Sequence, residues 1–203
     1  MKIKLLKKLS ITSAFLVLIG CASQAPTTSQ EDQFKVLPCA FPDGTEPTPA
    51  PDWICNPNFP DFDLVAVSSY QQSNMGYDYM ETMAISRARN KLAREISNTA
   101  ASSIEDYREK TGSLRTGNET NMSVDQIAQK IKANVKLNGS RVLNKARNYK
   151  TGAIYVAVGI STDNLNSMVD QAIGVEFGSD SAEFQRFKAS QSFDKLKSDL
   201  AGE

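Results

Sequence analysis

The sequence of 203 residues contains no histidine. This absence excludes serine and cysteine hydrolases that use a histidine base, and it excludes histidine-ligated metal sites. Cysteine is scarce too, with three residues whose spacing fits no structural zinc site. We therefore expect no catalytic residue, no metal and no cofactor, and we expect that the protein is not an enzyme.

An excess of charge of one sign is also missing. Lysine plus arginine and aspartate plus glutamate number 23 each, so no basic surplus indicates a nucleic acid as partner. Apolar residues form 40% of the chain and charged residues 23%. That balance supports a packed core and is too apolar for general disorder. The length suits one ordinary domain with appendages, or two small domains.

The N-terminus has the pattern of an export signal. Four lysines precede the apolar run Ile11–Ile19, which is about half as long as the roughly 20 residues that a membrane-spanning helix needs. The sequence Leu-Ile-Gly-Cys then ends at Cys21 and resembles the bacterial lipobox, in which the cysteine is acylated and the signal is cut before it. We predict a lipoprotein signal peptide over residues 1–20 and lipidation of Cys21, an ordinary secretory signal being the alternative.

The acylated Cys21 predicts a lipid anchor in the cell outer membrane. Ala22 stands where an aspartate would resemble an inner-membrane retention signal, so we expect the periplasm-facing side of the outer membrane, with surface display as the alternative. Cleavage before Cys21 removes four lysines and no acid, which leaves 19 basic and 23 acidic residues and a net charge of −4. Since anionic lipids repel such a chain slightly, the acyl chains must hold it to the membrane.

Two segments precede the predicted domain. Residues 21–36 are rich in Ser, Thr, Gln and Pro and predict a flexible tether. Residues 37–62 combine many prolines with aromatic side chains, which predicts an extended segment lying over the folded body. Within it, Cys39 and Cys55 enclose fifteen residues. An exported chain favours their pairing as a structural disulfide, which the loop-entropy account values at roughly 3 kcal/mol.

Residues 63–177 predict an α+β domain, a small antiparallel sheet with a long helix and further helices packed on one face. A short strand at 64–67 precedes a helix at 77–110, whose apolar residues recur every fourth position and which Gly112 caps. Ser123 and Gln126 form a capping-box pattern that opens a second helix. A hairpin of strands at 141–149 and 153–161 follows, and then a third helix capped by Thr162 or Asp163.

The second strand of the hairpin alternates clearly between two faces. We expect its larger residues to face the helices, and its smaller ones to lie on a lightly covered or packed second face: Ile154, Val156, Val158 and Ile160, against Ala153, Tyr155, Ala157 and Gly159. Residues 178–203 predict an amphipathic helical tail. The tail either packs on its own body or reaches a second copy of the chain, and the second choice predicts a homo-oligomer.

A few side chains are candidates for contact with a ligand or partner. Trp53 is a packing residue or a ligand platform. Arg141, Lys145 and Arg147 lie on one hairpin and form a solvated strand face or a contact with an acidic partner. The carboxylates on the long helix raise the possibility of glycosidase-type pairs, but their Arg and Lys neighbours favour a solvated face.

Four stretches of the chain resemble one known family. They are residues 51–54 (Pro-Asp-Trp-Ile), the strand at 64–67, the helix residues 84–96 and the closing residues 152–159. Together they are similar to the Lpp-twenty family of twenty-kilodalton outer-membrane lipoproteins, whose relatives include a flagellar assembly lipoprotein. Cys39 and Cys55 lie outside the family pattern.

The resemblance implies a structural or assembly role in the bacterial envelope, flagellum-associated in some relatives, with envelope or flagellar proteins as partners. No catalytic residue defines the family. The alternative function is a periplasmic binding module for peptidoglycan or another glycan, with Trp53 and the hairpin as the contact.

Overall fold

The computed structural model describes residues 38–112 and 123–202. The predicted signal peptide over residues 1–20, the lipidation site Cys21 and the tether over residues 21–36 lie outside these residues. Among the helices described, none combines the length and the apolarity that a bilayer crossing requires.

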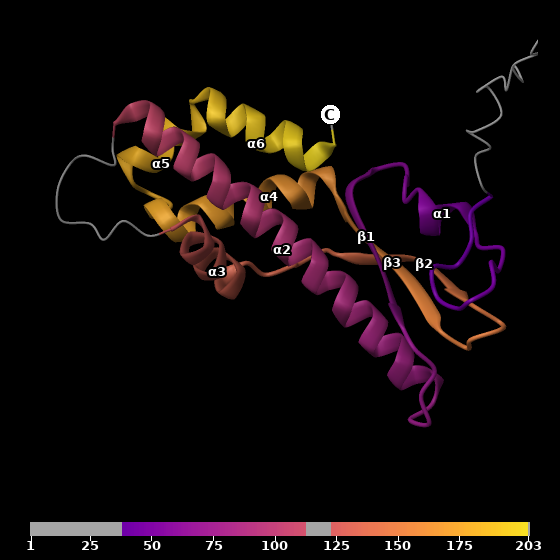
Figure 1. Ribbon diagram of the computed structural model, residues 1–203. Helices are drawn as coiled ribbons and strands as arrows, with labels where there is room; N and C mark the ends of the chain where they lie inside the picture. Colours follow the sequence, from indigo (N-terminus) through magenta and orange to yellow (C-terminus); the bar gives the residue numbers. More distant parts are fainter. Residues whose placement is uncertain (1–37, 113–122, 203) are drawn as a thin grey trace, which may run out of the picture. The chain divides into compact units, whose positions relative to one another are not determined.

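A three-stranded antiparallel sheet holds the strand order β1-β3-β2 (Figure 1). β1 spans Phe62–Tyr70, β2 spans Arg141–Arg147 and β3 spans Ile154–Ser161. β1 pairs with β3 up to Tyr70↔Ile154, and β2 pairs with β3 with a bulge between Val142 and Asn144. Every residue of β3 except its last is buried, because the strand is central and both faces of the sheet are covered. The predicted α+β fold is confirmed.

The helix α2 (Tyr77–Thr111) crosses one face of the sheet and continues beyond it (Figure 1). Its predicted apolar stripe is the core: Ala84, Ala88, Leu92, Ile96, Ala100 and Ile104 are all fully buried. The larger side chains of β3, from Ile154 to Ile160, pack against the same stripe. Gly112 ends the helix with a φ of 70°, and its N–H donates to the carbonyls of Arg108 and Glu109. Left-handed backbone of this kind favours glycine, so the predicted cap is confirmed.

Two further helices complete this layer. α3 (Val124–Asn134) opens with the predicted capping box, in which Ser123 and Gln126 bond each other's main chain. α4 (Thr162–Phe177) starts one residue earlier than expected, so the prediction of Thr162 or Asp163 as its cap is wrong. Ser161 is the N-cap because β3 runs straight into the helix. Its hydroxyl makes no capping bond to the main chain and instead accepts from the side-chain amide of Asn164 at 2.8 Å.

A buried carboxylate ties these helices together. Glu176 on α4 has a side chain only 6% exposed, and it accepts from Arg108 of α2 at 2.8 Å and from Lys130 of α3 at 2.9 Å. Burial alone would raise the pKa of Glu176, but the hydrogen bonds from Lys130 and Arg108 outweigh it and lower the pKa below its ordinary value. A buried, doubly paired charge of this kind fixes how three helices meet.

The predicted helical tail forms two helices, α5 (Ala182–Lys188) and α6 (Gln191–Ala201), and not one continuous helix. The break arises because Ser190 caps a new helix, its side chain accepting from the N–H of Phe193. Both helices pack on the chain's own body. Phe187 and Leu196 are fully buried, and the Phe187 ring centroid lies 5.2 Å from that of Tyr107 on α2. Residues 178–202 thus belong to the same core as the predicted domain.

The second face of the sheet is covered by the proline-rich segment that precedes β1. Phe41 of this segment lies with its ring centroid 5.0 Å from that of Tyr155, and both pack with Ala153. The segment lies over the body as predicted, but it is not extended throughout. α1 (Asp52–Cys55) forms a single helical turn in which the carbonyl of Pro51 accepts from the N–H of Ile54.

Candidate interaction surface

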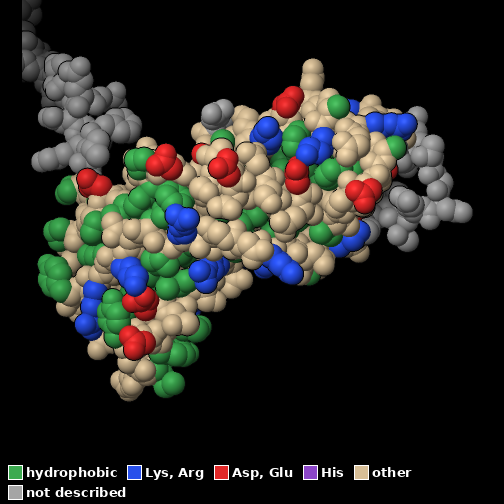
Figure 2. All heavy atoms as spheres, turned by 180° about the vertical axis from the view of Figure 1, so that it is seen from behind, with side chains coloured by type: hydrophobic (Ala, Val, Ile, Leu, Met, Phe, Trp, Pro, Cys, Tyr) green, Lys and Arg blue, Asp and Glu red, His purple; other side chains and the backbone are tan. Residues whose placement is uncertain are grey.

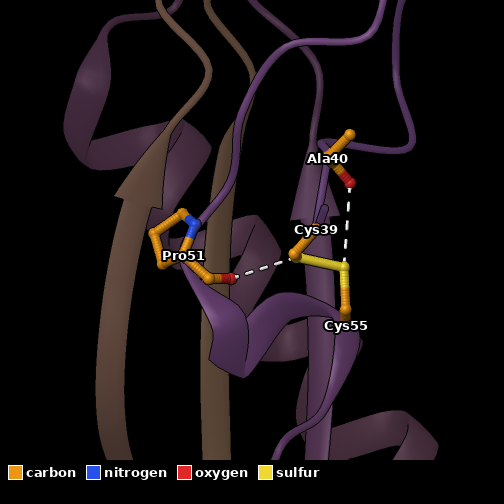
Figure 3. The surroundings of a disulfide bond; sticks show 4 residues. All are labelled: Cys39, Ala40, Pro51 and Cys55. Atoms are coloured by element: carbon orange, nitrogen blue, oxygen red, sulfur yellow. Dashed lines mark hydrogen bonds between the residues drawn. A yellow bond between two sulfur atoms is a disulfide. The ribbon is translucent and has the colours of Figure 1, made fainter. Parts of the chain in front are cut away.

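The covering segment is closed on itself by the predicted disulfide. Cys39 and Cys55 are joined at an S–S distance of 2.12 Å, with their Cα atoms 5.8 Å apart. The Cys39 sulfur lies 3.3 Å from the Pro51 carbonyl oxygen, and the Cys55 sulfur lies 3.9 Å from that of Ala40 (Figure 3). The bond therefore clamps the start of the segment to α1.

Asp43 fastens this closed segment to the sheet. Its carboxylate accepts hydrogen bonds from the hydroxyls of Thr151 and Tyr155, and from the amide of Asn148 at 3.1 Å. Burial would raise the pKa of Asp43, but these three hydrogen bonds outweigh it and lower the pKa below its ordinary value. The pKa of Tyr155 shifts in the opposite direction, because burial and the Asp43 carboxylate both raise it. This cluster could not be predicted from the sequence, since Asp43 lies more than 100 residues from each of its three partners.

Trp53 lies on α1 and is half-buried. It packs, together with Ile54, against the cluster of Phe41, Ala153 and Tyr155. This position fits the packing interpretation of the residue. Part of the side chain therefore contributes to the packing on the second face of the sheet.

The three basic residues of the hairpin do not form one cluster. Arg141, at the start of β2, lies opposite Gly159 and therefore on the second face. Lys145 and Arg147 lie opposite Val156 and Ile154, on the helix face. The Glu81 carboxylate of α2 pairs with Lys145 and raises its pKa, and Arg147 donates to the Gly152 carbonyl at 3.3 Å. All three side chains are exposed, and Arg141 has no ion-pair partner in the described part of the chain.

The exposed large hydrophobic residues all lie at one end of the sheet. Across the described residues they are Met75, Tyr77, Tyr79 and Tyr149, and we call them the tyrosine surface. Tyr149 is 73% exposed in the β2–β3 turn, and Met75 is 69% exposed in the β1–α2 loop. The loop and the turn are neighbours because β1 ends opposite the start of β3 (Figure 1). Sequence reasoning missed this surface, because exposure cannot be read from an isolated tyrosine.

Charged side chains border the tyrosine surface. Lys145, Arg147 and Lys150 lie on or beside the same turn, and Figure 2 shows hydrophobic side chains interspersed with both basic and acidic ones at this end. Tyrosine, methionine and arginine are the residue types enriched at the centres of protein interfaces. The arrangement therefore suits contact with another macromolecule.

The two edges of the sheet differ. On β1, Lys91 of α2 donates to the Val67 carbonyl at 2.6 Å and Arg87 donates to the Ser69 carbonyl at 3.0 Å. Arg87 also stacks on the Tyr70 ring, 4.5 Å from its centroid. On the outer side of β2, the described residues show one such side-chain bond, in which the Asn144 side chain of the same strand accepts from the N–H of Lys145 at 2.9 Å. One edge is therefore blocked and the other is open.

The acidic residues of α2 form no recognisable metal centre. In the part of the chain that the structure describes, no three cysteine, aspartate or glutamate side chains are grouped so that they could hold a metal ion. Asp106, one of the carboxylates considered above, accepts from Lys110 and from Ser192 of α6, both at 2.8 Å. Burial raises the pKa of Glu95.

Comparison with known proteins adds no assignment: no family model and no curated protein matches the chain.

Proposed function

We propose that the protein is a lipid-anchored lipoprotein of the bacterial outer membrane with a non-catalytic role in the structure or assembly of the envelope, including the flagellum. It acts by binding other proteins. The tyrosine surface is the observation that carries this proposal, because it gathers the exposed large hydrophobic side chains of the described chain at one end of the sheet, beside cationic residues. The lipobox-like sequence ending at Cys21 and the resemblance to the Lpp-twenty family support the location.

The anchor is tested by Cys21→Ser. In a lipoprotein, acylation of the cysteine precedes cleavage, so this variant should accumulate as uncleaved precursor and take up no labelled fatty acid. Normal processing of the variant would contradict the lipid anchor.

The partner-binding role is tested by photo-crosslinking of the full chain in its own cells. Tyr149→p-benzoylphenylalanine should yield a discrete crosslink to an envelope protein. The matched control is the same substitution at Glu183, an exposed residue of α5 in the helical tail. Identical crosslinking from both positions, or none from Tyr149, would count against the tyrosine surface as a binding site.

Glycan binding is the second candidate function, and the exposed rings of Tyr77 and Tyr149 favour it because aromatic faces stack on sugar rings. Trp53, the contact expected from the sequence, is half-buried against the second face, so the two tyrosines present more of their rings. Co-sedimentation of the protein with purified peptidoglycan, abolished by Tyr77→Ala and Tyr149→Ala together, would establish this alternative.

A further inference from the structure

We propose that β2 is a docking strand, to which an extended acidic segment of a partner protein adds as a fourth strand of the sheet. This inference rests on the partner-binding role proposed above and names the chemistry of the partner. Strand addition to an open edge uses main-chain hydrogen bonds for affinity and side-chain pockets for specificity.

The outer main-chain groups of β2 are available. The N–H of Asn148 donates to the Ala153 carbonyl at 2.9 Å, so it points toward β3. Alternate residues of an antiparallel strand point the same way, which places Ala146 and Asn144 toward β3 and Lys145 and Arg147 away from it. The outward N–H of Lys145 bonds only the side chain of its neighbour Asn144, at 2.9 Å. A partner strand can replace that local bond.

The outward carbonyls of β1, at the other edge of the sheet, are bonded by side chains from α2. Lys91 and Arg87, one helical turn apart on α2, occupy two outward carbonyls of β1. Such side-chain cover is a known means of preventing unwanted strand pairing. On β2 the nearby cations leave the main chain uncovered, since Lys145 pairs with Glu81 and Arg147 with the carbonyl of Gly152.

A groove of about 560 Å³ lies on the helix side of the open edge. Its walls are α2 and the chain that leads from α3 to β2, with Ile85, Val135 and Leu137 as apolar lining. α2 meets β2 at the Glu81–Lys145 ion pair and meets the residue before β2 at the bond from Arg89 to Ser140. The lining residues Thr82, Ile85 and Ser86 fall between those two points on α2, so this wall of the groove follows the stretch of helix that lies beside β2, although no residue of β2 lines it. Side chains on one face of an added strand would reach into it.

The charged side chains around β2 and the groove determine which kind of segment can bind there. Arg89 and Lys132 line the groove, and Arg141, Lys145 and Arg147 lie along the strand. Of the acids near this strand, Glu81 is paired with Lys145, Glu46 is paired with Lys150 beyond the end of β2, and Asp43 is bonded to Asn148 and Thr151. Asp78 lies in the first turn of α2. A second copy of the chain pairing edge to edge would bring like charges opposite one another, which destabilises a sheet. A strand with acidic side chains is complementary in charge to the basic residues along β2 and the groove.

The test uses the full chain and two blocked seven-residue peptides of alternating composition, Thr-Glu-Val-Glu-Val-Glu-Thr and the same peptide with lysine in place of glutamate. Fluorescence anisotropy should show binding of the acidic peptide alone. Arg141→Glu with Arg147→Glu should weaken that binding at least tenfold, whereas Arg186→Glu on α5, also exposed, should leave it unchanged. Circular dichroism confirms that each variant is folded.

Hydrogen exchange resolved to single amides distinguishes strand addition from mere charge attraction. The acidic peptide should slow exchange at the amides of Lys145 and Arg147, while Asn144 and Ala146, already bonded to β3, change little. Absence of binding, equal binding of both peptides, or charge-dependent binding without protection of the two outward amides would overturn the proposal. In each of those cases a persisting crosslink at Tyr149 would leave the partner-binding role intact, so the two proposals fail separately.

Discussion

The carboxylate of Asp43, in the loop closed by the Cys39–Cys55 disulfide, accepts a hydrogen bond from the hydroxyl of Tyr155, on the central strand. The two residues are 112 positions apart. The bond joins the segment that covers the second face to the strand that forms the middle of the sheet. Its loss should therefore loosen the cover without dismantling the helical layer.

Asp43→Asn should lower the free energy of unfolding by about 1–2 kcal/mol at pH 7, because three donors lose a charged acceptor. The pKa of Asp43 is lowered in the folded protein, so its stabilising contribution is complete above the ordinary aspartate pKa and is lost as the pH falls through the folded-state value. The difference in melting temperature between wild type and variant should shrink below about pH 4. An equal difference at pH 3 and pH 7 would contradict this assignment.

Removal of the disulfide should destabilise the fold without changing its architecture. Cys39→Ser with Cys55→Ser should reduce the free energy of unfolding by roughly 3 kcal/mol, the value for closing a loop of about this length. Denaturant titration followed by circular dichroism measures the loss. Wild-type protein, denatured without reductant, should show no reactive thiol at either position, and reaction of both would disprove the bond.

The core face of α2 can be tested with two neighbouring residues. Leu92 is fully buried, so Leu92→Ala should cost about 2–5 kcal/mol. Arg94 is exposed, and Arg94→Ala should change stability by no more than about 0.5 kcal/mol. Thermal unfolding of both variants gives the comparison, and similar melting temperatures would mean that the helix face is misassigned.

The tail offers a matched pair of the same kind. Leu196→Ala should cost about 2–5 kcal/mol because the side chain is fully buried, whereas exposed Lys195→Ala should be nearly neutral. Since the apolar residues of α5 and α6 pack on the chain's own body, size exclusion with light scattering should give the same mass for both variants and wild type. A change of mass with Leu196→Ala would restore the earlier alternative, in which the tail binds a second copy.

Features set by neighbouring residues could be predicted from the sequence. The four-residue spacing of Ala84, Ala88 and Leu92 located the core face of α2, because a helix repeats every 3.6 residues. The capping box at Ser123 and the cap at Gly112 are equally local. Alternation in β3 assigned its larger side chains to the helical face correctly.

Features that depend on distant residues could not be predicted. Nothing near Asp43 indicates that Thr151 and Tyr155 will bond it, because the fold alone brings them together. The proline-rich segment was expected to lie over the folded body, but the sequence did not indicate which face of the sheet it covers. Likewise, Lys145 and Arg147 share a hairpin with Arg141, yet the bulge between Val142 and Asn144 and the pairing with β3 put Arg141 on the other face.

The disulfide also determines how the fold would bear mechanical load. Any pull on the chain upstream of Pro38 reaches Cys39 almost at once, and the bond passes it directly to Cys55, so the fifteen residues between them are not stretched. The force then enters β1 at Phe62, which is paired along its length with β3. Under reducing conditions the same pull would first peel the cover from the second face.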